Sequence, residues 1–363
     1  MYFMWKEKEV LDLLDGKKAD AILVSNSYNI RYLSGFTGSA GYLYISKKRK
    51  ALLTDFRYTF QAKTQVFPGI EVIETGTPYY KMLRTLFLED DIQKVIFEGK
   101  DMLYMDFMVF KRNVKDKEDK EVVWEPLEEE LYYLRAVKTK EEIEKMREAE
   151  NIGDLAFLHI LNVLKPGMTE LEVAAELEYA MKKNGAEGFS FDTIAASGLH
   201  SSMPHAVPTN KRIEKGEFLV MDFGCIYQGY CSDMTRTVMI GKADRKQKKM
   251  YDTVFMAQKE AFDFIKAGYK GNEIDKTARD YIYANGYEGC FGHGLGHSVG
   301  LFIHENPRFS PLEEAVIPIG AVMTVEPGIY MEGAYGVRIE DLITITETGC
   351  ENLTASVKEL IEI

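Results

Sequence analysis

The stretch EFLVMDFGCIYQGYCSDMTRTVMIG, residues 217–241, decides the fold of the C-terminal part of this chain. It contains two strand-like apolar runs that flank a Gln-Gly dipeptide at 228–229, which is suited to a tight turn. If that dipeptide forms the turn, Thr235 lies opposite Asp222, and Asp233 lies two residues further along on the same face. Diagonal neighbours of this kind are about 7–8 Å apart at their Cα atoms, so the two carboxylates can share a metal ion.

The apolar surroundings of these aspartates support a metal site. Asp222 is flanked by Met221 and Phe223, and a carboxylate inside such a strand is costly to bury without a cation. A single strand aspartate is usually a surface residue. A pair on one face of two apolar strands makes a bound metal as good an explanation as a surface position.

The segment GAVMTVEPGIYMEGAYGVRIEDLITI, residues 320–345, repeats this arrangement. Glu326 and Glu340 are equidistant from residue 333, so a hairpin centred there sets them opposite each other. Pro327 cannot donate to the ladder and is expected to bend the strand. Two carboxylate-bearing hairpins in one chain are hard to explain as surface decoration.

A glycine-rich segment between the two hairpins contains three of the six histidines. It is CFGHGLGHSVGLFIHENPRFS, residues 290–310, with His293, His297 and His304. The residue after His293 is glycine rather than glutamate, and the many glycines argue against a helix, so the HExxH zinc motif is excluded. The glycines instead allow the backbone to approach another group closely.

Two further histidines, His200 and His205, lie in the Ser/Pro-rich segment SGLHSSMPHAVPTNKRI, residues 197–213. This composition is typical of a mobile or substrate-facing loop. His159 lies among apolar neighbours in a predicted helix and is interpreted as structural.

Composition excludes several classes of function. The 363 residues include 45 Lys and Arg against 57 Asp and Glu, a net charge of −12 that argues against nonspecific nucleic-acid binding. The four cysteines form no CxxC pair, which excludes a zinc ribbon and argues against a disulfide scaffold. No signal peptide and no apolar run of membrane-spanning length are evident. We therefore expect a reduced, soluble, cytoplasmic protein.

Hydrophobic periodicity predicts two domains. Residues 1–135 alternate helices and strands, as in a compact α/β domain. Thr139 and Glu142 form a capping-box pattern at the start of a long amphipathic helix, which places the boundary near residue 135. In residues 136–363 helices and strands come in blocks, which predicts an α+β fold with a mostly antiparallel sheet. A block of helices followed by strands is expected to occur twice there. The later helices are predicted at 169–184, 245–267 and 272–285.

Together, four carboxylates and one imidazole make an oxygen-rich ligand set. Such a set suits Mn²⁺, Co²⁺ or Zn²⁺ better than copper or an iron–sulfur cluster. Two bridging carboxylates can hold two ions about 3.5–4 Å apart, the spacing of two-metal hydrolases.

With these motifs in this order, residues 140–360 resemble the pita-bread metallopeptidases of family M24, which include methionine aminopeptidase, aminopeptidase P and prolidase. The resemblance covers essentially the whole C-terminal domain and implies two divalent metal ions. It also implies that Asp222 binds one ion, that His297 and Glu326 bind the other, and that Asp233 and Glu340 bridge them. The motifs that carry these ligands are MDFG, SDMTRT, GHGLGH, VEPGIY and VRIED.

The resemblance also implies residues that act on the substrate. The catalytic positions are His205 and His304, which would hold the substrate and the tetrahedral intermediate, and Glu326, the expected proton shuttle. The positions expected to bind or support the substrate are His293, Arg308, Tyr330 and Arg338.

The N-terminal domain narrows the choice within the family. The runs NIRYLSGFTGSAGYLYI and ALLTDFRYTFQAK resemble a creatinase/prolidase-type N-terminal domain. Methionine aminopeptidases lack that domain, and creatinase lacks the metal ligands. The resemblance therefore implies a Xaa-Pro peptidase, either prolidase, which Arg308 favours because it suits a dipeptide carboxylate, or aminopeptidase P. A non-catalytic pita-bread binding protein is the alternative from a different class, disfavoured because every ligand is retained.

The same resemblance implies the partners. Short proline-containing peptides are the expected substrates, a homodimer is the expected assembly, and Mn²⁺ is the favoured metal, with Co²⁺ or Zn²⁺ as alternatives. No nucleic-acid or membrane partner is expected.

Overall fold

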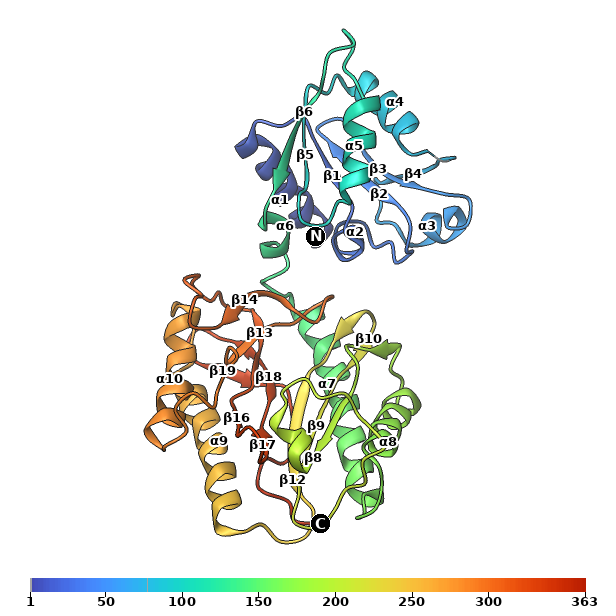
Figure 1. The fold of residues 1–363 in the computed structure, drawn as a ribbon. Helices are drawn as coiled ribbons and strands as arrows, with labels where there is room; N and C mark the ends of the chain where they lie inside the picture. The colour runs from blue at the N-terminus through green and yellow to red at the C-terminus, as the bar shows by residue number, and fades with distance from the viewer. Residues whose placement is uncertain (1, 77) are drawn as a thin grey trace. The chain divides into compact units, whose positions relative to one another are not determined.

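The structure is a computed structural model that describes residues 2–76 and 78–363 (Figure 1). The chain divides between Arg135 and Ala136 into two compact units. Each unit has its own sheet structure and its own apolar core. None of the described helices is long and apolar enough to cross a membrane.

The first unit is built on one mixed sheet of six strands in the order β4-β3-β2-β1-β5-β6. Strands β1, β2 and β3 pair antiparallel, whereas β1 with β5, β5 with β6 and β3 with β4 pair parallel. Its elements are α1 (Tyr2–Lys17), β1 (Ala21–Val24), α2 (Ser27–Ser34), β2 (Tyr42–Ser46), β3 (Lys50–Thr54), α3 (Thr59–Gln65), β4 (Glu71–Glu74), α4 (Tyr80–Asp90), β5 (Lys94–Glu98), α5 (Tyr104–Asn113), β6 (Val123–Leu127) and α6 (Glu130–Tyr133).

Helices cover this sheet. Alternate residues of β1, Ala21 and Leu23, share a core with Leu83 and Phe87 of α4 and with Phe110 of α5. The other two residues of β1 are also fully buried, so both faces of the central strand are covered. The predicted α/β character of this region is therefore confirmed.

The second unit contains the segments that carry the predicted chemistry. Its elements are α7 (Lys140–Val163), α8 (Glu170–Lys183), β7 (Gly188–Phe189), β8 (Ile194–Ser197), the 3-10 helix η1 (Gly198–Ser202), β9 (Phe218–Phe223), β10 (Cys225–Tyr227), β11 (Tyr230–Cys231), β12 (Met234–Met239), α9 (Arg245–Phe264), α10 (Gly271–Ala284), β13 (Gly296–Ser298), β14 (Glu305–Phe309), β15 (Val322–Val325), β16 (Gly328–Tyr330), β17 (Gly336–Arg338), β18 (Asp341–Ile345) and β19 (Cys350–Asn352).

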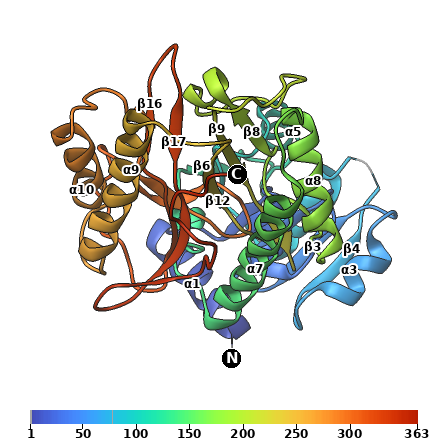
Figure 2. The same cartoon turned by 90° about the horizontal axis from the view of Figure 1, so that it is seen from below.

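A helix pair followed by strands occurs twice in this unit. Helices α7 and α8 contact each other and share a core with β9 and β12, whereas α9 and α10 share a second core with β14, β15 and β18. Figure 2 shows the two helix pairs on opposite sides of the strands. Every pairing between named strands of the unit is antiparallel within the described residues, which confirms the predicted α+β class.

The helix boundaries follow the capping signals in the sequence. Thr139 and Glu142 form the predicted capping box, in which the side chain of each bonds the backbone N–H of the other. Helix α7 begins at Lys140, directly after Thr139. The end of α9 differs from the prediction, because the helix stops at Phe264 instead of 267. The backbone N–H of Ala267 donates instead to the carbonyl of Thr346, a tertiary contact that sequence periodicity does not reveal.

Both predicted hairpin registers are confirmed. Thr235 pairs with Asp222 in the β9–β12 ladder. In the second hairpin, the pairs Val325–Asp341 and Gly328–Arg338 enclose Glu326 and Glu340, which therefore face each other in register. Strand β15 ends before Pro327 and β16 begins after it, as the missing N–H requires.

The two hairpins meet at their carboxylate positions. Thr235 of β12 forms an antiparallel bridge with Glu340, which directly precedes β18. The backbone N–H of Glu340 donates to the carbonyl of Thr235 at 3.1 Å. This bridge brings the acidic residues of both halves of the unit to one place.

Candidate metal centre and active site

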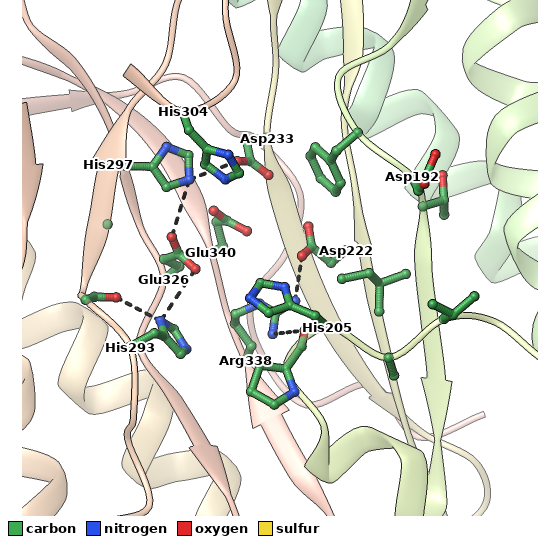
Figure 3. A pocket seen from close by; sticks show the side chains of 18 of the residues that line it. Asp192, His205, Asp222, Asp233, His293, His297, His304, Glu326, Arg338 and Glu340 are labelled. Atoms are coloured by element: carbon green, nitrogen blue, oxygen red, sulfur yellow. Dashed lines mark hydrogen bonds and ion pairs between the residues drawn. The ribbon is translucent and has the colours of Figure 1, made fainter. Parts of the chain in front are cut away.

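A single cavity of about 470 Å³ collects the acidic residues and the histidines of the second unit (Figure 3). Its wall includes all five of the residues predicted as metal ligands: Asp222, Asp233, His297, Glu326 and Glu340. The first two come from the β9–β12 hairpin, and the other three come from the second half of the unit.

The imidazole of His297 lies between two carboxylates. Its Nε2 atom is 3.5 Å from Oδ2 of Asp233 and 3.6 Å from Oε1 of Glu326. Donor atoms of Asp233, His297 and Glu340 all lie within 4.8 Å of one another. These three residues therefore form a cluster with the dimensions of a metal site.

The surrounding backbone fixes the orientation of His297. Its Nδ1 atom faces the carbonyl oxygen of Ser298 at 3.1 Å, and a carbonyl can only accept, so Nδ1 carries the proton. The lone pair of Nε2 is then directed at the carboxylates. The preceding Gly296 allows close strand packing, because a Cβ there would lie 2.0 Å from the carbonyl oxygen of Thr324.

The carboxylates are buried close to one another, and their pKa values rise. Burial, followed by the neighbouring charges of Glu340 and Asp222, raises the pKa of Asp233 well above its ordinary value. Burial, followed by the charge of Glu326, does the same to the pKa of Glu340. Burial raises the pKa of Glu326 to about 8, with Arg338 opposing the shift. With all four carboxylates ionised, the cluster would carry more negative charge than Arg338 offsets.

Three histidines of the cavity have lowered pKa values, which favours their neutral form. Burial, with a smaller contribution from His304, lowers the pKa of His297 to about 3. Burial and the charge of Arg338 lower the pKa of His293 to about 4. Burial and the charge of Arg308 also lower the pKa of His304. A neutral imidazole is the form that binds a metal ion.

The residues present fit divalent metal ions. Oδ1 of Asp222 is buried and has no hydrogen-bond partner among the described residues. Buried polar atoms are normally paired, so this oxygen is suited to binding a cation. Carboxylate oxygens and one neutral imidazole nitrogen are a donor set that divalent ions such as Mn²⁺, Co²⁺ and Zn²⁺ accept.

The two histidines predicted to act on the substrate, His205 and His304, also line the cavity. The ring of His304 lies 4.6 Å from the ring of His297, centroid to centroid, in an edge-to-face contact. Arg308 pairs with His297 across the β13–β14 ladder and also lines the cavity.

A hydrogen-bonded row supports one side of the cavity. Nδ1 of His293 faces the carbonyl of Gly294 at 2.8 Å and therefore donates, which leaves Nε2 to accept from the hydroxyl of Tyr330 at 2.9 Å. Nη1 of Arg338 donates to the same hydroxyl at 2.8 Å. His293 and Arg338 line the cavity, whereas Tyr330 lies behind them and supports both.

Comparison with known proteins identifies the family. The metallopeptidase family M24 matches residues 144–347, more than half of the chain, and the creatinase/prolidase N-terminal domain matches residues 8–148. This chain belongs to metallopeptidase family M24. The predicted pita-bread C-terminal domain, preceded by a creatinase-type N-terminal domain, is thereby confirmed.

Relatives of this M24 peptidase match it along nearly their whole length. A Xaa-Pro dipeptidase of Pyrococcus horikoshii is 38% identical over 98% of both chains. The solved structure of a Xaa-Pro dipeptidase from Bacillus anthracis superposes with a TM-score of 0.95 at 42% identity, over 99% of this chain and 100% of the other. The solved structure of an X-Pro aminopeptidase from Thermotoga maritima superposes with a TM-score of 0.88 at 38% identity, over 95% of this chain and 98% of the other.

Sequence reasoning missed part of the cavity wall of the M24 peptidase. The start of β8 and the segment before it contribute four adjacent residues, Phe191, Asp192, Thr193 and Ile194. The only available signal was an acidic residue just before an apolar strand. The hydroxyl of Thr324 was also missed, although it lies on the same strand face as Glu326, two residues away, and donates to it at 3.2 Å.

The remaining histidines of the M24 peptidase do not line the cavity. His200, which was expected in a substrate-facing loop, instead bonds the buried carboxylate of Glu170. His159 of α7 bonds Glu176 of α8 at 2.8 Å, a contact between two helices that agrees with its interpretation as structural.

Proposed function

We propose that this M24 peptidase hydrolyses the Xaa-Pro bond at the N-terminus of dipeptides or short peptides, with two divalent metal ions as cofactors, and that Xaa-Pro dipeptides are its preferred substrates. The observation that carries this proposal is the single cavity whose wall combines the four carboxylates and the imidazole predicted as metal ligands with three further histidines and two arginines. The names of two relatives that match nearly end to end, both Xaa-Pro dipeptidases, support the same substrate class.

In this proposal Asp222, Asp233, His297, Glu326 and Glu340 would hold the two ions. When bound, such ions supply Lewis acidity, which acidifies a water molecule and polarises the scissile carbonyl. The partnerless oxygen of Asp222 and the short distances around His297 support the assignment.

Glu326 moves the proton. Its carboxylate accepts the proton of the attacking water and returns it to the proline nitrogen as that nitrogen leaves. The hydroxyl of Thr324 donates to Oε1 of Glu326 at 3.2 Å, and this contact holds the carboxylate in one orientation during both transfers.

His205 and His304 stabilise the tetrahedral intermediate. An imidazole carries at least one N–H, and from the cavity wall this group can donate to the oxyanion that develops from the scissile carbonyl. The depressed pKa of His304 supports a hydrogen-bond donor role rather than that of a fixed positive charge.

Arg308 is assigned to the C-terminal carboxylate of a dipeptide, because a guanidinium fork binds a carboxylate through two parallel hydrogen bonds. His293, Tyr330 and Arg338 complete the substrate-binding set, Tyr330 by holding the other two. An aminopeptidase P that acts on longer Xaa-Pro peptides is the second candidate, which the similarity to the X-Pro aminopeptidase of Thermotoga maritima favours.

We further infer that residues 136–363 form the catalytic domain and residues 1–135 the N-terminal domain, and that the chain works as a cytoplasmic homodimer. Mn²⁺ is the favoured metal, with Co²⁺ and Zn²⁺ as alternatives. The net charge of −12 supports the expectation that nucleic acids are not partners.

The test is an activity assay on metal-free protein reloaded separately with Mn²⁺, Co²⁺ or Zn²⁺. The substrates are a Xaa-Pro dipeptide, a Xaa-Pro-Yaa tripeptide and a Xaa-Ala dipeptide as control. Faster cleavage of the dipeptide supports the dipeptidase, and faster cleavage of the tripeptide supports the aminopeptidase. Cleavage of neither proline substrate would overturn the proposal and leave a non-catalytic binding protein.

A further inference from the structure

The loop that carries His205 begins and ends at one buried carboxylate. The loop comprises residues 198–208 and follows β8. Ser197 precedes it, Thr209 follows it, and both bond the side chain of Glu170, the first residue of α8. Glu170 is 0% exposed.

The two oxygens of Glu170 serve opposite ends of the loop. Oε1 accepts from the backbone N–H of Ser197 at 2.8 Å and from its hydroxyl at 3.0 Å. Oε2 accepts from the backbone N–H of Thr209 at 3.1 Å and from its hydroxyl at 2.7 Å. Nδ1 of His200, inside the loop, lies 3.1 and 3.0 Å from the two oxygens.

This arrangement is strong because the carboxylate is charged. Burial alone would raise the pKa of Glu170, but the donors from Ser197, Thr209 and His200 outweigh it and lower the pKa below its ordinary value. Hydrogen bonds to a charged acceptor are about twice as strong as bonds between neutral groups. Glu170 therefore closes the base of the loop at both ends.

The far side of the loop rests on the hairpin of the metal centre. The hydroxyl of Ser201 accepts from the N–H of Gly336, the first residue of β17, at 2.9 Å. A Cβ at Gly336 would lie 2.2 Å from the carbonyl oxygen of Ser201, so the two segments are in close contact. The carbonyl of Pro204 accepts from Nη1 of Arg338 at 3.3 Å, directly before His205.

We propose that Glu170 is a positioning residue for His205: its carboxylate ties both ends of loop 198–208, and the tied loop holds the imidazole in the wall of the cavity. Figure 3 shows that imidazole beside Asp222 and Arg338. The catalytic consequence rests on the proposed function, whereas the tie itself does not. Glu170 has no part in the predicted metal site, because its contacts are with the loop.

A double-mutant cycle in catalysis tests the catalytic consequence. We expect Glu170→Ala to lower kcat for the Xaa-Pro substrate by about 10- to 100-fold, since a displacement of about 1 Å in a reacting group has effects of that size. In a His205→Ala background, Glu170→Ala should lower kcat by less than about threefold, because the residue that Glu170 positions is no longer present. Equal losses in both backgrounds would indicate a general structural role and overturn the proposal.

Graded variants and a matched control sharpen the result. Glu170→Gln keeps one acceptor but presents an NH₂ group to the donors at the other end of the loop, so its loss should be intermediate. If Glu170→Ala does not fold, Thr209→Val serves in its place in the cycle, because it removes the hydroxyl that donates to Glu170 and accepts from the N–H of Lys211 while it retains the side-chain shape. Glu176→Gln makes the same change on the same helix, where its partner is His159, and should leave kcat unchanged.

Amide hydrogen exchange tests the tie without any reference to activity. In metal-loaded protein, peptides covering 198–208 should exchange at least tenfold faster in Glu170→Ala than in wild type or Glu176→Gln, while α8 peptides beyond its first turn remain protected. Unchanged exchange in 198–208 would overturn the proposal. A wild-type protein without Xaa-Pro activity would overturn the proposed function, and the exchange comparison would still decide whether Glu170 holds the loop.

Discussion

Arg338 and Asp222 form a short ion pair between a guanidinium and a predicted metal ligand, with Nη2 2.5 Å from Oδ2. Both side chains are largely buried. The second oxygen of Asp222 has no hydrogen-bond partner among the described residues. One oxygen of this carboxylate is therefore held by the protein, and the other is available to a metal ion.

Arg338→Met should destabilise the metal-free protein strongly. It leaves the Asp222 carboxylate buried without its cation, and breaking a buried pair in this way costs about 3–5 kcal/mol. The free energy of unfolding, measured with urea in the presence of a chelator, should fall by about that amount. Added Mn²⁺ should recover part of the loss, because a bound cation replaces the missing charge. Arg338→Lys, which keeps the charge, is the control, and an unchanged urea midpoint in Arg338→Met would contradict the prediction.

Glu326→Ala should abolish turnover while the fold is largely retained. The variant removes the proposed proton shuttle and one metal ligand, so we expect kcat to fall by at least 1000-fold, on the order of what a positioned general base supplies. Steady-state assays and circular dichroism measure the two effects. Glu332→Gln, an exposed acid at the tip of the same hairpin, is the control. Full activity in Glu326→Ala would exclude the assignment.

Metal binding should release protons and should strengthen as the pH rises. Burial and neighbouring charges raise the pKa of Asp233 and of Glu340, and burial raises that of Glu326 to about 8, so metal-free carboxyls retain protons that a metal ion displaces. The dissociation constant for Mn²⁺ should therefore fall between pH 6 and pH 8. Calorimetry in two buffers of different ionisation enthalpy counts the released protons, and identical heats in both would refute the prediction.

The same raised pKa values predict that the metal-free protein becomes less stable as the pH rises. A carboxyl with a raised pKa binds more protons in the folded state than in the unfolded state, so its contribution is favourable at low pH. That contribution is lost as the pH rises from the ordinary glutamate pKa, near 4.5, through about 8 for Glu326. The melting temperature of chelator-treated protein, corrected with a Glu326→Gln comparison, should show this decline, and a rise over that range would be inconsistent with it.

Thr324→Val should weaken metal binding with little effect on the fold. The Thr324 hydroxyl accepts from the backbone N–H of His297 at 3.0 Å and donates to Glu326 at 3.2 Å, so it orients two predicted ligands at once. Loss of such an outer contact typically costs 10- to 100-fold in metal affinity. Metal titration measures the change. Thr344→Val, on the neighbouring strand β18, is the matched control, and equal affinities in the two variants would contradict the assigned role.

Strand register was predictable because an antiparallel ladder is fixed by the centre of its turn. Counting outward from 228–229 placed Thr235 opposite Asp222, and counting from 333 placed Glu326 opposite Glu340; both registers are found. The five motifs also sufficed to predict the family, because each carries one predicted ligand and they follow one another in the order that the family shows.

Contacts between distant segments were not predictable. His200 and His205 lie in the same kind of local sequence, yet the first bonds Glu170 and the second lines the cavity. The difference arises from α8, whose Glu170 carboxylate comes to lie between the two ends of the loop, within reach of His200, only after folding. The contribution of Asp192 and Thr193 to the cavity was not predictable for the same reason, since one acidic residue before an apolar strand does not indicate a cavity wall.

The bridge between Thr235 and Glu340 lies on the seam between the two halves of the second unit, and the predicted ligands come from both sides of that seam. A metal ion held there is a non-covalent cross-link between the halves, in addition to the packing of Phe218 of β9 and Met239 of β12 against the core of α9 and α10. Its removal should therefore loosen the seam before it unfolds either half. The loaded protein should protect the backbone amides at the seam from hydrogen exchange more strongly than the metal-free protein.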